Sequence, residues 1–334
     1  MKYRQLGKSN LQVSPVCLGA MMFGDQTGLD EARSILADAH ERGVNFLDTA
    51  DVYTKGASER MLGDLLQGQR HDWVLATKLG NPMTGRVNET HFSRSWMMRA
   101  VDDSLQRRQT DYIDILYMHR DVNGMDLEEP VRAFDAMMRA GKIRYWGISN
   151  FNGWRIAEVM RVAQRLGMPA PVVCQPYYNL LNRMPEVEIL PACEHYGIGV
   201  TSYSPIARGV LTGKYAPGQA PAQGTRAARG DKRMAQTEFR EESLLIAQKL
   251  MVHAQAKGVS LAQFATAWVL AHRAVSSVIA GPRTLAQWQD YFPALDYTVT
   301  REDEDLIDSL VRPGHPSTPG FSDPAYPLYP RVRG

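Results

Sequence analysis

Four side chains suited to proton chemistry lie at the ends of short apolar stretches of the sequence. Asp48 and Tyr53 follow one such stretch, Lys78 closes the next, and His119 closes a third. A tyrosine has a pKa near ~10, so it exchanges a proton at neutral pH only with assistance. A neighbouring ammonium such as that of Lys78 favours the phenolate and lowers the tyrosine pKa. Tyr53 is therefore the predicted proton donor.

The other three side chains can support that donor. The stretch that ends in Lys78 is apolar, so this lysine is expected to be partly buried and to need a carboxylate partner, which Asp48 can supply. His119 can donate a hydrogen bond to a carbonyl oxygen and stabilise its developing negative charge. The group supplies a proton but no hydride, so a reduction here requires a cofactor. Each residue taken alone is also compatible with a structural role.

The elements that would position these residues alternate regularly along the chain. Strands are predicted at Val16–Ala20, Asn45–Thr49, Trp73–Lys78, Ile113–His119, Tyr145–Ser149, Val172–Pro176, Gly199–Ser204 and Ser277–Gly281. Helices are predicted between them at Asp30–Arg42, Ser58–Leu66, Ser93–Arg107, Leu127–Arg139, Trp154–Leu166 and Pro185–His195, with capping glycines at Gly43, Gly141 and Gly167. Alternation of this kind predicts parallel pairing, and eight units favour an α/β fold of the (β/α)8 TIM barrel type. Active residues of such barrels lie at the carboxyl ends of the strands.

Three segments fall outside the alternation. Residues from Tyr3 to Val13 predict an N-terminal β-hairpin, and 207–240 form a long connection before helix resumes near Glu241. The proline-rich tail from about residue 312 is expected to be extended, within a single domain spanning 1–334. An open dinucleotide-binding sheet is the weaker interpretation, because no Gly-x-Gly-x-x-Gly follows the first predicted strand.

Composition restricts the possible partners and location. The 334 residues are 44% hydrophobic and 22% charged with a formal net charge of +2, so no general basic field would attract nucleic acid. No signal peptide and no membrane-spanning apolar run is visible. The three cysteines, Cys17, Cys174 and Cys193, lie far apart, which argues for a reducing compartment. We expect a cytoplasmic protein without nucleic-acid or membrane partners.

Several motifs together resemble those of a known family. Asp48-Thr49-Ala50-Asp51-Val52-Tyr53, the strand-end Lys78, and His119 in Leu116-Tyr117-Met118-His119-Arg120 resemble the catalytic tetrad of the aldo-keto reductase superfamily. The chain is most similar to its bacterial, potassium-channel-β-subunit-like branch. This resemblance implies NADPH-dependent reduction of an aldehyde or ketone, with hydride from the cofactor and a proton from Tyr53.

The resemblance also implies a nicotinamide site. Gly147-Ile148-Ser149-Asn150-Phe151 and Gln175 match the residues that bind the carboxamide in this family, and Tyr203 matches the aromatic residue that stacks on the ring. Ser204 follows that tyrosine. The segment Gly209-Val210-Leu211-Thr212-Gly213-Lys214-Tyr215 resembles the loop that covers the pyrophosphate. The cofactor contacts implied here are Met21, Ser149, Asn150, Gln175, Tyr203, Ser204, Gly209, Leu211, Gly213 and Lys214.

The far end of the cofactor is assigned to the sequence after the eighth predicted strand. This point, where a helix begins, is a common phosphate site of barrels, and the planar guanidinium of Arg283 suits a phosphate. The resemblance assigns Arg283 to the adenosine 2′-phosphate, which implies NADP(H), and adds Gly281, Gln287 and Asp290 as contacts. The chain departs from its relatives at Tyr291, where they tend to carry asparagine. Tyr291 cannot copy an amide contact to adenine, although its ring could stack.

Substrate contacts are expected from the first loop and from the catalytic strands. Phe23 with Met21 would form one wall, and Tyr53, His119 and Arg120 would contact a small carbonyl substrate. Met21 stands where many members of the family have tryptophan, which suggests a more adaptable wall. The basic residues of the long connection either cover an anionic ligand or belong to a solvated loop; they are Arg226, Arg229, Lys232 and Arg233.

Alternative functions use the same residues differently. The resemblance extends to potassium-channel β subunits, so a non-catalytic, NADP-binding regulatory subunit is the principal alternative, and a homo-oligomer is possible. Lys78 could act as a Schiff-base nucleophile. Asp48 argues against that role, because an ion pair keeps a lysine protonated. No metal is expected, since the eight histidines form no His-x-His or His-Glu-x-x-His motif.

Overall fold

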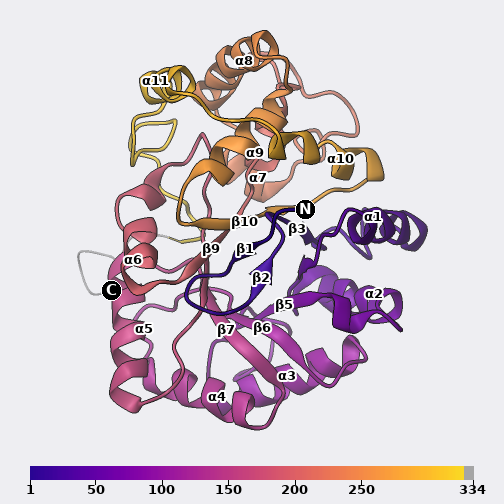
Figure 1. Ribbon diagram of the computed structural model, residues 1–334, viewed down its shortest axis with the longest axis vertical. Helices are drawn as coiled ribbons and strands as arrows, with labels where there is room; N and C mark the ends of the chain where they lie inside the picture. Colours follow the sequence, from indigo (N-terminus) through magenta and orange to yellow (C-terminus); the bar gives the residue numbers. More distant parts are fainter. Residues whose placement is uncertain (327–334) are drawn as a thin grey trace. The chain divides into compact units, whose positions relative to one another are not determined.

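The computed structural model describes residues 1–326 and confirms the predicted barrel. Its eight strands close on themselves, and the paired neighbours run parallel (Figure 1). Around the barrel the order is β10 (Val275–Ala280), β3 (Val16–Gly19), β4 (Phe46–Asp48), β5 (Val74–Leu79), β6 (Ile113–Met118), β7 (Ile143–Ser149), β8 (Val173–Gln175) and β9 (Gly199–Tyr203). Every strand end lies within two residues of its predicted position.

The register of the strands brings the predicted catalytic residues to one end of the barrel. Barrel strands are covered on both faces, which is why they are continuous apolar runs, and all residues of β5 are buried. Asp48 pairs with Ala76 across β4 and β5, and Lys78 pairs with Tyr117 across β5 and β6. The carboxyl ends of three adjacent strands therefore carry Asp48, Lys78 and the residue before His119.

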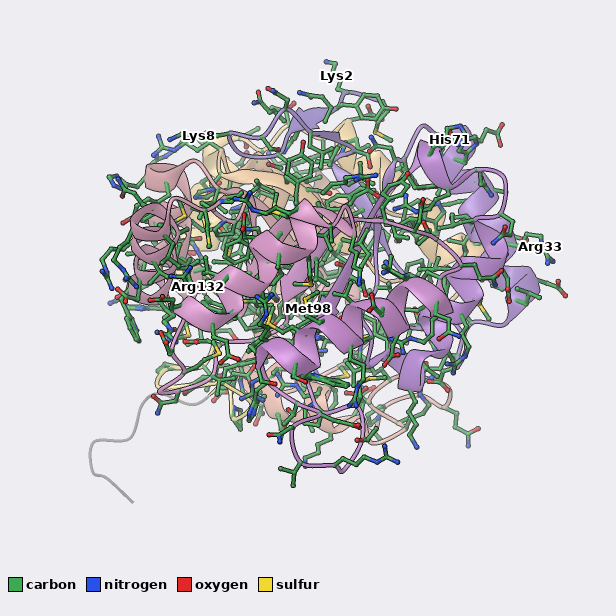
Figure 2. All side chains as sticks on the ribbon, turned by 90° about the horizontal axis from the view of Figure 1, so that it is seen from below. Lys2, Lys8, Arg33, His71, Met98 and Arg132 are labelled. Atoms are coloured by element: carbon green, nitrogen blue, oxygen red, sulfur yellow. The ribbon has the colours of Figure 1, made fainter. Side chains whose placement is uncertain are left out.

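The helices predicted between the strands are present. They are α1 (Leu29–Glu41), α2 (Ala57–Leu65), α3 (Arg94–Arg107), α4 (Glu128–Arg139), α5 (Gly153–Leu166) and α6 (Ile189–Tyr196). The structure adds the short helix α10 (Leu285–Gln289) after β10 and the 3-10 turns η1 (Tyr53–Gly56) and η2 (Arg70–Asp72). Figures 1 and 2 show α3 and α4 side by side outside the strands. Figure 2 also shows Lys2, Arg33 and His71 at the periphery, with their side chains directed outward.

Local sequence explains where these helices begin and end. The Ser93 hydroxyl accepts a hydrogen bond from the Trp96 amide and caps α3. Gly43, Gly141 and Gly167 follow helices with φ of 77°, 74° and 64°, which confirms their predicted left-handed conformation. The predicted helix Pro185–His195 is wrong as one element. It divides into η3 (Met184–Glu186) and α6, because Glu188 has non-helical φ and ψ angles.

The residues group into two compact units. The first comprises Met1–Pro176, Glu188–Ser202 and Ala274–Gln289, and so contains nearly all of the barrel strands. The second comprises Tyr177–Val187, Tyr203–Arg273 and the residues from Asp290 onward. It contains η3, η4 (Ala207–Thr212), α7 (Lys232–Thr237), α8 (Glu241–Ala256), α9 (Leu261–Ala271), η5 (Phe292–Leu295) and α11 (Arg301–Leu310). Helix α8 begins at Glu241, as predicted, but the connection 207–240 is not free of helix, because it contains η4 and α7. A single domain spanning 1–334 stays a prediction.

The prediction for the N-terminal end of the chain is confirmed, whereas the prediction for the C-terminal tail is not. The N-terminal hairpin is confirmed as the antiparallel pair β1 (Arg4–Gln5) and β2 (Gln12–Val13). The extended tail is wrong for residues 312–326, which form successive turns closed by the amides of His315, Phe321 and Tyr326. Glycines within this segment adopt left-handed angles that reverse the chain. Residues 327–334, which the same prediction included, lie outside the described part of the chain.

Among residues 1–326, every helix is too short or too polar to cross a membrane.

Candidate active site

Three of the predicted catalytic side chains are linked by hydrogen bonds. The Lys78 ammonium donates to a carboxylate oxygen of Asp48 at 2.5 Å, to the Thr49 carbonyl at 2.8 Å and to the Tyr53 hydroxyl at 3.3 Å. Lys78 is only 1% exposed, whereas Tyr53 at the start of η1 is half-buried. The lysine thus joins a buried carboxylate to a tyrosine that remains accessible.

The charges of Lys78 and Asp48 depend on each other. Burial opposes the charge of Lys78, but the Asp48 carboxylate and Tyr53 outweigh it, so the pKa of Lys78 is raised. Burial raises the pKa of Asp48, although Lys78 and the Gln175 amide oppose this effect. The Gln175 amide nitrogen donates to the second Asp48 oxygen at 2.8 Å. Lys78 is therefore held as an ammonium beside Tyr53.

His119 completes the group as a neutral imidazole. Its ring centroid lies 5.9 Å from that of Tyr53 in an edge-on arrangement. Burial first, then the charges of Lys78 and Arg120, hold the pKa of His119 well below 6.5. Nδ1 is enclosed without a partner among the described residues. An unpartnered acceptor costs less than an unpartnered N–H, so the proton belongs on Nε2. His119 can then donate a hydrogen bond without carrying charge.

The residues predicted to clamp the carboxamide lie directly beside this group. The Asn150 amide donates to the His119 carbonyl at 2.9 Å and to the Ser149 hydroxyl at 3.0 Å, and Ser149 donates to the Gln175 carbonyl at 2.8 Å. Asn150 has φ of 59°, a left-handed angle that asparagine tolerates better than most residues. The side chains of Ser149 and Asn150 and the Gln175 carbonyl, at the ends of β7 and β8, thus lie next to His119.

Another set of predicted cofactor residues follows β10 in the first unit. Gly281 directly follows the strand, and the Arg283 carbonyl accepts a hydrogen bond from the Thr27 hydroxyl at 3.1 Å. The Gln287 side chain accepts from the Arg283 amide at 3.0 Å. Helix α10 has only five residues, so the dipole of this helix contributes little to phosphate binding.

The remaining predicted cofactor residues belong to the second unit. Tyr203 ends β9, and Asn179 donates to the Ser204 carbonyl at 3.0 Å. The segment assigned to the pyrophosphate is η4 with the residues after it; Gly209 and Gly213 have positive φ, Leu211 is fully buried, and the Lys214 ammonium lies 5.3 Å from the Tyr215 ring. Asp290 accepts from Gln263 at 2.7 Å, and Tyr291 is buried.

The predicted substrate contacts differ in accessibility. Met21 is half-buried and Arg120 is partly exposed, but Phe23 is completely buried. Phe23 therefore contributes packing rather than an open wall in this structure. Arg120 contacts the Asp121 carbonyl at 3.4 Å, whereas the Asp121 carboxylate pairs with Arg155 at 3.0 Å.

The basic residues of the long connection are largely engaged within the second unit. Arg226 pairs with Asp231 at 2.8 Å, and Arg233 forms a two-pronged pair with Asp323 at 2.6 and 2.9 Å. Such pairing favours a role in ordering the loop and tail over the attraction of an anion.

Sequence reasoning missed a second cluster of buried charge. Glu59 on α2 is completely buried and contacts Arg107 and Arg108 of the α3 region at 2.7 and 3.4 Å. Asp51 is 1% exposed, its carboxylate has no hydrogen-bond partner among residues 1–326, and burial raises its pKa to about 8. It lines a cavity of about 340 Å³ with Trp96 and other residues of the first unit. Nothing in the local sequence distinguishes these acids from surface residues.

Comparison with known proteins agrees with the fold. The profile of the aldo/keto reductase family matches residues 15–312. A rice (Oryza sativa subsp. japonica) protein named "Probable voltage-gated potassium channel subunit beta" is 38% identical, over 93% of this chain and 97% of its own. "Uncharacterized oxidoreductase YrpG" of Bacillus subtilis (strain 168) is 34% identical, over 90% of this chain and 93% of its own. The chain therefore belongs to the aldo/keto reductase family.

This membership confirms the resemblance drawn from the sequence. Together with relatives named as oxidoreductases, it supports an oxidoreductase, and this family generally uses a nicotinamide cofactor. Within residues 1–326, no three histidine, cysteine or acidic side chains gather as metal ligands.

Proposed function

We propose that this protein reduces an aldehyde or ketone to an alcohol with NADPH, using Tyr53 as the proton donor. The observation that carries the proposal is the position of the Lys78 ammonium, which contacts both the buried Asp48 carboxylate and the half-exposed Tyr53 hydroxyl. A cation held at 3.3 Å from a phenol stabilises the phenolate left after proton transfer.

Each neighbour of Tyr53 has a separate task. Asp48 keeps Lys78 protonated and fixed, and Gln175 orients Asp48. The neutral His119 donates a hydrogen bond to the carbonyl oxygen, which positions it and stabilises its developing charge. The Tyr53 hydroxyl then gives its proton to that oxygen. Arg120 is the proposed polar contact for the remainder of the substrate.

The chain offers suitable groups for a nicotinamide dinucleotide, which supplies the hydride when bound. The donors and acceptors of Ser149, Asn150 and Gln175 suit a carboxamide, and they lie next to the catalytic group. Tyr203 offers an aromatic face, and the backbone from Gly209 to Lys214 suits a pyrophosphate. The guanidinium of Arg283 would select the 2′-phosphate of NADPH over the hydroxyl of NADH.

A fluorescence titration with NADPH and NADH, followed by a screen of carbonyl substrates, tests this proposal. We expect tight NADPH binding, much weaker NADH binding, and substrate-dependent oxidation of NADPH. The Arg283→Ala variant should weaken NADPH far more than NADH. Equal losses for both nucleotides would contradict the 2′-phosphate assignment, and absence of binding by the wild type would contradict the whole proposal.

A regulatory subunit is the second candidate, because two plant relatives are named as probable potassium-channel β subunits. A protein of this kind binds the nucleotide but turns over little or no carbonyl substrate. NADPH binding with no turnover across a broad aldehyde and ketone screen would favour it. We further propose that the protein is cytoplasmic and that its substrate is a small carbonyl compound. We also propose that identical subunits assemble, which light scattering would test.

A further inference from the structure

The ring of Tyr203 is stacked against a second tyrosine in the same unit. The centroids of Tyr177 and Tyr203 lie 5.5 Å apart, and their planes differ by 26°. The two residues also form an isolated parallel β-bridge, with Tyr177 following β8 and Tyr203 ending β9, which fixes the separation of their backbones. Tyr203 remains partly exposed despite this contact. The Tyr177 ring thus supports the Tyr203 ring, and part of the Tyr203 side chain stays accessible.

The hydroxyl of Tyr177 is influenced by the charges of a nearby ion pair. Burial, followed by the charge of the completely buried Glu238 carboxylate, raises the pKa of Tyr177 well above 10. Glu238 pairs with Arg208 at 3.0 Å, and Arg208 also donates to the Thr237 hydroxyl at 3.2 Å. The Tyr177 ring is therefore positioned by its stack on Tyr203 and by the backbone bridge between the two residues.

The same ion pair reaches the segment assigned to the pyrophosphate. Arg208 has φ of 51° and immediately precedes Gly209, whose φ is 96°. A side chain in this uncommon backbone conformation needs strong contacts to hold it, and Glu238 supplies them. The stacked pair and this ion pair both belong to the second unit, and the charges of the ion pair act on Tyr177.

We propose that Tyr177 is a positioning residue for hydride transfer, because it fixes the plane of the Tyr203 ring on which the nicotinamide would stack. This inference rests on the proposed function. The plane of the stacking ring determines the plane of the nicotinamide, and hydride transfer is sensitive to alignment of the reacting atoms. Tyr177 itself touches neither cofactor nor substrate in this proposal; it acts through Tyr203.

The test compares two ligands in wild type and Tyr177→Leu. One ligand is NADPH, and the other is 2′-phosphoadenosine diphosphoribose, which lacks the nicotinamide base. An aromatic pair contributes the equivalent of roughly 2- to 10-fold in affinity, so NADPH binding should weaken by about that factor. Binding of the base-free ligand should stay unchanged, and kcat should fall. Tyr177→Phe keeps the ring and should rescue most of the NADPH affinity.

Tyr178 provides a matched control. Its ring lies 5.3 Å from that of Trp268, and its hydroxyl donates to Glu186 at 2.8 Å, so it also combines an aromatic neighbour with a carboxylate partner. It makes no ring contact with Tyr203 among the described residues. Tyr178→Leu should lower the melting temperature without changing the ratio of the two affinities. If Tyr177→Leu does not fold, Tyr177→Met fills the space with a flexible apolar chain and permits the same comparison.

The outcomes separate this inference from the proposed function. A loss of NADPH affinity that spares the base-free ligand supports the role of Tyr177. Equal losses for both ligands, or NADPH affinity and kcat equal to wild type, overturn it while leaving the reductase intact. A wild type that binds neither ligand overturns the proposed function, and the inference with it.

Discussion

Adjacent residues of β5 point into two buried charge clusters with different properties. Lys78 reaches Asp48 on one side of the strand, and Thr77 donates to Glu59 at 2.7 Å on the other, because successive side chains of a strand face opposite ways. Each cluster pairs a completely or almost completely buried carboxylate with a cation. The residue types at the centre of each are therefore similar.

The difference lies in what remains accessible. Glu59 is surrounded by donors from Thr77, Ser104, Arg107 and Arg108, so its carboxylate is satisfied from within the fold. The cluster around Lys78 instead ends at the half-exposed hydroxyl of Tyr53. A buried ion pair that is enclosed on all sides can only stabilise the fold. One that contacts a hydroxyl group accessible to a ligand can also assist proton transfer. Burial or pairing alone does not distinguish the two roles.

The largest expected effect comes from removing the accessible proton. Tyr53→Phe should lower kcat/KM by roughly 10²- to 10⁴-fold, because general acid catalysis is lost while packing is retained. NADPH affinity, measured by fluorescence, should stay near wild type. Retention of activity to within about tenfold would show that the cluster around Lys78 is as structural as that around Glu59.

Removing the carboxylate of the enclosed cluster around Glu59 should lower the free energy of unfolding and not the catalytic rate. Glu59→Gln leaves Arg107 and Arg108 without their buried carboxylate and should reduce the free energy of unfolding by about 3–5 kcal/mol, measured by urea denaturation. The exposed Glu41 of α1 offers a matched control, because Glu41→Gln should change stability very little. A catalytic loss in the folded Glu59 variant as large as that of Tyr53→Phe would contradict the comparison.

Asp51 tests the effect of a buried carboxyl group without a partner. Its pKa of about 8 lies above the unfolded value near ~4, so between these pH values the folded chain binds more protons than the unfolded chain. Stability should therefore fall as pH rises from 5 to 8, and Asp51→Asn should remove roughly 2–4 kcal/mol of that fall. Urea denaturation at both pH values measures it. The exposed Asp296 is the control; an equal effect of Asp296→Asn would exclude Asp51 as the cause.

The smallest expected effect comes from one hydrogen bond of the enclosed cluster. Thr77→Val removes a donor to Glu59 and should cost about 1–2 kcal/mol of unfolding free energy. The neighbouring Lys78 keeps its contacts, so kcat should be unchanged. A fall in kcat without a fall in stability would mean that the two faces of β5 are coupled.

The residues of this site that could be predicted from the sequence are those that lie at the carboxyl ends of strands. Asp48, Lys78 and the residue before His119 close three adjacent strands, and parallel strands of a barrel bring their carboxyl ends together, so their proximity followed from the alternation of apolar stretches. Ser149 and Gln175 end two more strands, and the family resemblance of their motifs singled them out. The split of Pro185–His195 and the turns of the tail were missed, because they depend on backbone angles at single residues.

The sequence by itself determined the barrel and the end at which the reactive residues gather. Hydrophobic periodicity is a local property repeated along the chain, and successive strands of such a pattern pair with their neighbours. Only the tertiary structure decided which acids are buried and what they touch. Glu59 meets arginines of the α3 region, Asp51 meets no partner among the described residues, and Tyr177 stacks on Tyr203. Each of these contacts, or its absence, joins residues distant in sequence. Their energies depend on burial and distance, which no local pattern encodes.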